Sequence, residues 1–160
     1  MAVDMFIQIG DIKGESKDKT HKGKIDVLAW SWGVSNSGSA HVGGGAGAGK
    51  CNVQDLSLTK YMDSASTKLL NAACNGKHYP EALLIVRKAG ENPLEYLKIK
   101  LTEVLITSVS TGGSGGEDRL TENVTLNFAK VNVSYDVQDD KGGKGDHFEM
   151  GWDIAANVKC

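Results

Sequence analysis

Residues 82–88 read ALLIVRK, residues 89–93 read AGENP, and residues 94–109 read LEYLKIKLTEVLITSV. The first segment is almost wholly apolar, and the second holds the glycine, asparagine and proline typical of turns. In the third, apolar and basic residues alternate: Leu97, Ile99 and Leu101 against Lys98 and Lys100. Such alternation places one face of a strand in a core and the other in water. The stretch therefore predicts a long antiparallel hairpin.

Beyond this alternating part, both faces of the second strand become apolar, at Val104, Leu105 and Ile106. A strand with one solvated face does not need this pattern. We expect its outer side to be covered here, either by a neighbouring element or by another subunit. These three residues are our candidates for a subunit interface.

Shorter alternating segments predict the other strands. They lie at residues 3–9, 25–32, 52–61, 124–128, 131–135 and 150–154. The apolar positions change parity between Phe128 and Val131, which predicts a bulge or a corner between them. In residues 25–32, Leu28, Trp30 and Trp32 share one face, which we place in the core because large rings favour burial.

Residues 63–75 predict the one helix. Asp63 or Ser64 can cap its start, and Asn75–Gly76 can end it. Its apolar stripe consists of Ala65, Leu69, Ala72 and Ala73. With about seven strands, the chain is expected to form one mainly β domain over residues 1–160, a small barrel or two-sheet sandwich carrying one α-helix.

The 20 glycines gather in long polar segments, for which we predict flexible loops at about residues 10–24, 35–50, 110–118 and 139–147. A loop as long as 35–50 is usually functional or an interaction arm. Arm residues His41, Gly43, Gly44, Gly45, Gly47, Gly49 and Lys50 are candidates for such contacts. The alternative is that the segment merely connects two sheets.

Composition excludes several partners. The formal charge is −2, which gives no electrostatic case for nucleic acid. The longest apolar run, Ala82–Val86, is far too short for membrane insertion. The first residues lack the basic and apolar regions of a signal peptide, so we expect synthesis and folding in the cytoplasm. The three cysteines show no C-x-x-C spacing, which disfavours a zinc site or a disulfide framework.

The segment Gly44–Lys50 is a near miss to a phosphate-binding loop, and it is the best argument for a nucleotide-binding enzyme. Cys51 stands where Ser or Thr would bind Mg²⁺, and the residues that follow alternate as a strand. Ser114 lacks a strand-to-helix elbow, and the four histidines have no metal-binding spacing. We therefore predict no catalytic, metal or cofactor site.

Glu117, Asp118 and Arg119 are the remaining charged candidates. They either keep a loop soluble with a local ion pair, or they form a contact between subunits. Both alternatives stay open, and because these residues adjoin the strand with two apolar faces we retain them as candidate interface residues.

Several stretches resemble the haemolysin-coregulated protein (Hcp) family. They are MFIQIGDIKGES at 5–16, IDVLAWSWG at 25–33, GKHYP at 76–80, RKAG at 87–90 and VSTGGSGGEDRLTENVTL at 109–126. The polar tail after Gln138 and the terminal Cys160 depart from the family pattern.

The resemblance implies the tube protein of the bacterial type VI secretion system, a β-barrel that assembles into hexameric rings. The rings would stack into a hollow tube, driven outward by a contractile sheath behind a spike protein, with small effector proteins in the lumen. Export by contraction needs no signal peptide. On this reading, Val27, Ala29 and Ser31 are expected to line the lumen, and the arm at residues 39–50 is expected to reach a neighbouring ring.

Overall fold

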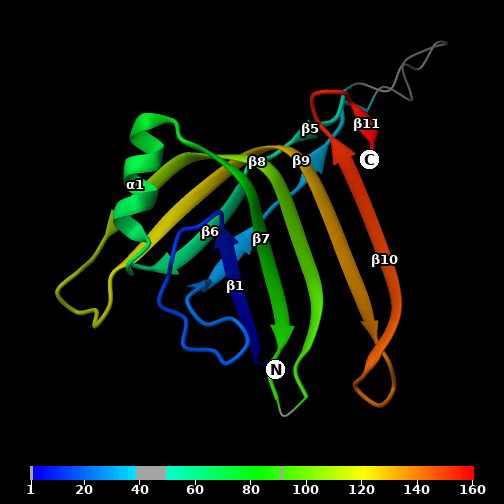
Figure 1. The fold of residues 1–160 in the computed structure, drawn as a ribbon, viewed down its shortest axis with the longest axis horizontal. Coiled ribbons are helices and arrows are strands. Elements are labelled where there is room, and N and C mark those ends of the chain that lie inside the picture. Colours follow the sequence, from blue (N-terminus) through cyan, green and yellow to red (C-terminus); the bar gives the residue numbers. More distant parts are fainter. Residues whose placement is uncertain (1, 39–49, 91) are drawn as a thin grey trace.

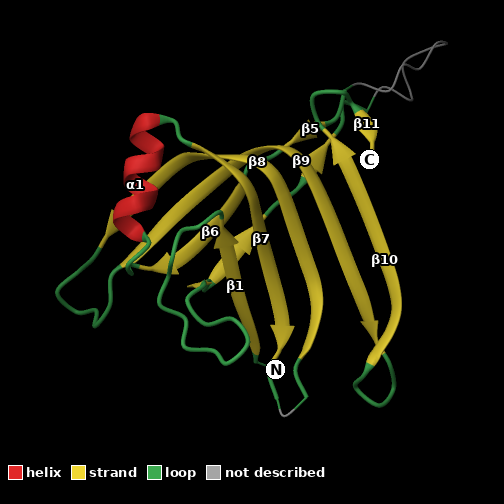
Figure 2. Cartoon of the chain, in the orientation of Figure 1, coloured by secondary structure: helices red, strands yellow, loops and turns green. Residues whose placement is uncertain are grey.

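The computed structural model describes residues 2–38, 50–90 and 92–160 and is mainly β (Figures 1 and 2). The strands are β1 (Val3–Ile9), β2 (Ile25–Asp26), β3 (Ala29–Ser31), β4 (Val34–Ser35), β5 (Asn52–Val53), β6 (Leu56–Tyr61), β7 (His78–Lys88), β8 (Leu94–Gly112), β9 (Thr121–Gln138), β10 (Lys144–Asp153) and β11 (Val158–Lys159). The helix is α1 (Ser66–Asn75). No helix among the described residues has the length and hydrophobicity needed to cross a membrane.

The large sheet closes on itself as a barrel. Its strands pair in the order β1, β7, β8, β9 and β6, and β6 then pairs with β3. The predicted strand at 25–32 is broken in two, because its first part pairs with β1 and its second with β6. The Val27 N–H donates to Met5 O at 3.0 Å, and the next N–H, of Leu28, donates to Thr59 O at 2.8 Å. This one change of partner completes the barrel.

The predicted hairpin forms and is longer than expected at both ends. β7 begins at His78 rather than at residue 82, and β8 continues to Gly112. Two predicted loops are shorter than expected, because the pairing of β8 with β9 and of β9 with β10 extends into them. The loop expected at 110–118 lies at 113–120, and the loop expected at 139–147 ends where β10 starts at Lys144.

The change of phase predicted between Phe128 and Val131 is present as a corner. In both β8 and β9, the residues that face the core switch between odd and even positions there. The pairing register does not change, since Val104 lies opposite Phe128 and Leu101 lies opposite Val131. Glu103, with φ 55°, makes the turn in β8. At the same point, β9 stops pairing with β6 and begins pairing with β10. The register shift itself lies elsewhere, between Ile106 and Ser108.

Helix α1 packs against β8 beside one end of the barrel (Figure 1). The predicted apolar stripe is confirmed, since Ala65, Leu69 and Ala72 are buried in the core. The predicted end is confirmed too: Gly76 has φ 70° and donates its N–H to Ala72 O at 3.0 Å. The predicted start is wrong, because Ala65 occupies the N-cap and the helix begins at Ser66.

Residues 10–24, which we call the strap, form an ordered loop with few regular elements. Its two halves are joined by backbone hydrogen bonds, from Gly14 N–H to Gly23 O at 2.8 Å and from Ser16 N–H to Lys24 O at 3.0 Å. The strap covers the outward side of β1 and β7. Phe6 and Arg87 are buried there, although neither belongs to the barrel core.

Candidate assembly surfaces

One outer face of the barrel carries only small, uncharged side chains. It spans four strands, and cross-strand register aligns its residues in two rows: Ala29, Thr59, Asn123 and Ser110, then Ser31, Ser57, Thr125 and Ser108. We call these eight residues the hydroxyl face. They point outward because the row between them, Trp30, Leu58, Val124 and Val109, packs into the core.

Four polar residues of this face are hydrogen-bonded to one another in two pairs. Thr59 Oγ1 donates to Asn123 Oδ1 at 2.8 Å, and Ser108 Oγ lies 2.6 Å from Thr125 Oγ1. At its border, Asp55 accepts from Thr107 Oγ1 at 2.8 Å and from Asn127 Nδ2 at 2.9 Å. A surface whose polar groups already have partners gains little by binding another molecule tightly.

The structure corrects the predicted pair of faces at residues 27–32. Ala29 and Ser31 are exposed, and Trp30 and Trp32 pack against the core, as expected. Val27, however, is buried at 6% exposure, and Leu28, which was expected in the core, is 40% exposed. Val27 cannot line an open surface, because the change of partner at this point reverses which residues face inward.

A second surface is apolar and uncovered. Phe148 lies opposite Tyr135, and Met150 lies opposite Val133, on the part of β9 and β10 beyond the barrel. The same face of the sheet, followed into β8, holds the buried Ile99 and Leu101. We call the exposed residues Tyr135, Val137, Phe148 and Met150 the apolar extension. It is a core-type face that one chain leaves open to water, on the side of the molecule away from α1 (Figure 1).

Two of the predicted interface residues are buried inside this chain. Val104 and Ile106 are 0% and 2% exposed, so they cannot contact another subunit. Burial still alternates within the run, so Val104 and Ile106 face the core and Leu105 lies on the other face of β8. Leu105 is half-buried. The sequence left two possible covers for this strand, a neighbouring element or another subunit. In the structure, helix α1 contacts β8.

Glu117, Asp118 and Arg119 are exposed in the loop between β8 and β9. Within the described residues they form no ion pair; the Arg119 guanidinium instead lies 3.8 Å from the centre of the Tyr61 ring. Both residues border a cavity of about 350 Å³ with Asp26 and Asp63. Burial raises the pKa of Asp26, as does the nearby Asp63, against a hydrogen bond from Ser16 and the charge of Arg119.

Most of the predicted arm lies outside the described residues, namely His41, Gly43, Gly44, Gly45, Gly47 and Gly49. Lys50 is described and exposed. The two ends of the loop meet where Val34 pairs with Val53 and Ser35 with Asn52. Since the chain after Lys50 enters strand β5, no helix start is available to hold a phosphate there.

The sequence analysis missed a buried charged cluster beneath the start of α1. Lys60 and Glu122 face each other across β6 and β9 as a fully buried ion pair. Asp63 Oδ1 lies 3.0 Å from Lys60 Nζ, and Ser66 Oγ donates to Glu122 Oε1 at 2.5 Å. The apolar neighbours of Lys60 and Glu122 could have drawn attention to them, because charges at inward positions of a strand need partners. Among the described residues, no three His, Cys, Asp or Glu side chains are grouped to hold a metal.

Comparison with known proteins identifies the family. Residues 6–135 match the family described as type VI secretion system effector, Hcp. This chain belongs to the Hcp family. It is 66% identical to protein hcp1 of Pseudomonas aeruginosa, over the full length of both chains.

Solved Hcp structures share the fold. Hcp1 from Salmonella typhimurium is 40% identical, with a TM-score of 0.84 and full coverage of both chains. Another type VI secretion protein is 32% identical, with a TM-score of 0.94 over 99% of this chain and all of the other. A type VI secretion effector from Yersinia pestis is 38% identical, with a TM-score of 0.76 over 94% of this chain and all of the other. The resemblance noted in the sequence is therefore confirmed, and with it the assignment to type VI secretion.

Proposed function

We propose that this Hcp chain is a tube subunit, that six copies close into a ring, and that rings stack into a hollow tube. The observation that carries the proposal is the apolar extension. A face continuous with the core but open to water is destabilising in a lone chain and favours association. Contact of this face with a different part of the next copy is a heterologous contact, the kind that closes rings.

The opposite side of the chain offers the surface that would meet it. Leu120 is 45% exposed in the β8–β9 loop, next to the predicted interface residues Glu117, Asp118 and Arg119. This loop and β10 lie at opposite sides of the molecule (Figure 2). One copy can therefore present its β8–β9 loop to the apolar extension of the next.

The hydroxyl face fits the lumen wall. Its side chains are small and bear no charge, and two pairs of them are hydrogen-bonded to each other. Small effector proteins would be carried without strong binding and released without a large energetic cost. The proposed lumen residues are Ala29 and Ser31 with their neighbours on β6, β8 and β9; Val27 is no longer among them.

The remaining partners follow from this role. The spike protein would cap the tube and the contractile sheath would surround it. The chain would be made in the cytoplasm and leave the cell with the tube. It would act by assembly rather than by catalysis.

Size-exclusion chromatography with light scattering, followed by negative-stain microscopy, tests the proposal. We expect a particle of six chains and annular images. A particle that stays monomeric at high concentration would contradict it. A monomer whose melting temperature rises with ATP and Mg²⁺ would instead support the nucleotide-binding reading of Gly44–Lys50.

A further inference from the structure

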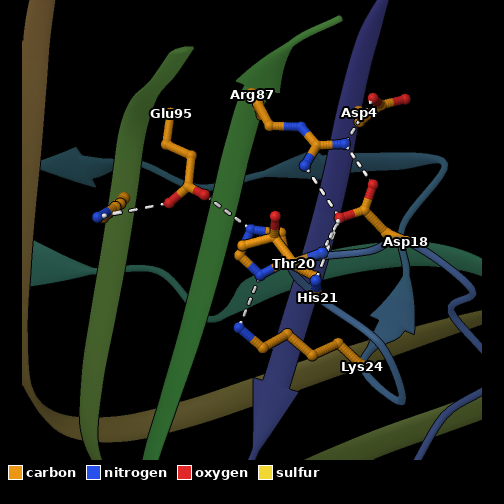
Figure 3. Close-up of polar contacts among 8 residues, drawn as sticks. Asp4, Asp18, Thr20, His21, Lys24, Arg87 and Glu95 are labelled. Atoms are coloured by element: carbon orange, nitrogen blue, oxygen red, sulfur yellow. Dashed lines mark hydrogen bonds and ion pairs between the residues drawn. The ribbon is translucent and has the colours of Figure 1, made fainter. Parts of the chain in front are cut away.

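Two neighbouring side chains of the strap contact the barrel: Asp18, which is paired with Arg87 of β7, and the histidine His21 (Figure 3). His21 is buried, and its ring lies 4.8 Å from the ring of Phe6 on β1. Its Nε2 is 2.7 Å from Glu95 Oε2 on β8, and its Nδ1 is 2.8 Å from Lys24 Nζ at the end of the strap. The histidine therefore contacts two strands, β1 and β8, and also Lys24, three residues further along the strap.

These two contacts define one protonation state. An ammonium group can only donate hydrogen bonds, so Nδ1 must accept from Lys24. A carboxylate can only accept, so Nε2 must carry the proton that is donated to Glu95. The geometry is satisfied by a neutral imidazole protonated on Nε2.

The charges around His21 balance without a charge on its ring. His21 belongs to a cluster of three carboxylates and three cations from the strap, β1, β7 and β8: Asp4, Asp18 and Glu95 with Lys24, Arg87 and Lys98. Arg87 already binds Asp18 at 2.6 Å and Asp4 at 3.0 Å, and Lys98 lies 3.6 Å from Glu95. A proton added to His21 would leave one charge uncompensated in this partly buried cluster.

Asp18 and Glu95 stay ionised in mild acid. The hydrogen bond from Arg87 lowers the pKa of Asp18 well below its ordinary range, against the effect of burial. Burial raises the pKa of Glu95, but the hydrogen bond from His21, together with Lys98, lowers it overall. Histidine is the side-chain type whose charge ordinarily changes between about pH 5 and 8.

We propose that His21 is an acid-sensitive latch: the neutral ring holds the strap on the outer face of the barrel, and protonation releases the Lys24 end. The added proton occupies Nδ1, which removes the acceptor for Lys24 and sets two cations against each other. Lys24 leaves, and the backbone bond from Ser16 N–H to Lys24 O weakens with it. The latch is independent of the proposed ring and lumen.

Hydrogen exchange measured by mass spectrometry at pH 7.5 and 5.5, corrected for intrinsic rates, tests the latch. We expect strap amides 14–24 to exchange at least about tenfold faster at pH 5.5, the size of effect given by losing one hydrogen bond to a charged group. Amides of β7 and β8 should not change. Unchanged or slower exchange of the strap in acid would overturn the proposal, since it would mean that the Glu95 contact alone holds a charged ring.

Two variants and one direct measurement separate this latch from general acid loosening. Lys24→Gln removes the opposing cation, so acid should no longer release the strap; a full acid response in this variant would contradict the mechanism. His21→Gln cannot titrate and should show equal strap exchange at both pH values. If His21→Gln does not fold, the carbon and nitrogen chemical shifts of His21 in the wild-type protein still decide, because at pH 7.5 they must report the Nε2-protonated tautomer.

Discussion

Phe148 of β10 lies directly opposite Tyr135 of β9, and the two side chains are 60% and 45% exposed. They occupy the face of the sheet that forms the core elsewhere. We expect Phe148→Ser to prevent ring formation, because each contact would lose about 2–3 kcal/mol of apolar burial. Light scattering during size-exclusion chromatography measures the result.

Leu70→Ser on α1 is the matched control for this change. Leu70 is also an exposed apolar residue, at 38%, but it lies on the helix away from the apolar extension. Rings should survive this substitution. If Phe148→Ser forms rings as readily as Leu70→Ser does, the apolar extension is not the ring contact.

Ser31→Glu tests the lumen. Residue 31 is exposed on the hydroxyl face, so rings should form normally. A cargo that covers this position would have to desolvate an unpaired carboxylate, and we expect retention of a co-expressed small effector to fall roughly tenfold. Asn71→Glu, on the exposed face of α1, adds the same charge elsewhere and should retain cargo. Equal retention by both variants would place Ser31 outside the lumen.

Deletion of residues 43–49 tests the arm. The paired strands β4 and β5 join the two ends of this loop, so the barrel should fold without it. We expect hexamers to persist while stacking into tubes, counted by negative-stain microscopy, falls sharply. Loss of the hexamer itself would show that the arm closes the ring instead.

Local alternation was sufficient to predict much of the fold. The Val3–Ile9 strand, the β7–β8 hairpin and the buried stripe of α1 follow from side-chain periodicity, which depends only on near neighbours in sequence. The corner near Phe128 was also visible, since a change of phase in apolar residues must bend or bulge a strand.

The errors share a cause in long-range pairing. Val27 was assigned outward because residues 25–32 alternate as one strand, whereas the chain changes partner from β1 to β6 at this point. Val104 was assigned to an interface because residues 104–106 are apolar on both faces, and which of the two faces turns into the barrel depends on pairing with distant strands. The hydroxyl face was recognised only at β3, because its other members come from three distant strands.

The buried pair of Lys60 and Glu122 predicts a non-additive response to mutation. Lys60→Met should lower the free energy of unfolding by about 3–5 kcal/mol, because it leaves Glu122 as an uncompensated buried charge. The double variant Lys60→Met with Glu122→Leu should recover most of this loss, since apolar residues of similar size replace the pair. Urea denaturation measures each variant. Equal losses in the single and double variants would show that packing, rather than unpaired charge, sets the cost.

The bond between Arg87 and Asp18 predicts how stability depends on pH. Arg87 donates to both carboxylate oxygens of Asp18, at 3.0 and 2.6 Å, and this lowers the Asp18 pKa in the folded chain. The unfolded chain therefore takes up a proton at higher pH than the folded chain does, near the ordinary value of 3.8. The stabilisation is complete well above that value and is lost as the pH falls below it.

Asp18→Asn should consequently cost about 2 kcal/mol at pH 7, the value of hydrogen bonds to a charged group. The difference from the wild type should shrink as the pH falls from about 5 toward 2. Urea denaturation at several pH values, in the Phe148→Ser background so that association does not contribute, measures this convergence. Asp146→Asn, which alters an exposed aspartate, should track the wild type throughout. A constant difference between Asp18→Asn and the wild type down to pH 2 would mean that the carboxylate charge of Asp18 does not contribute to the bond.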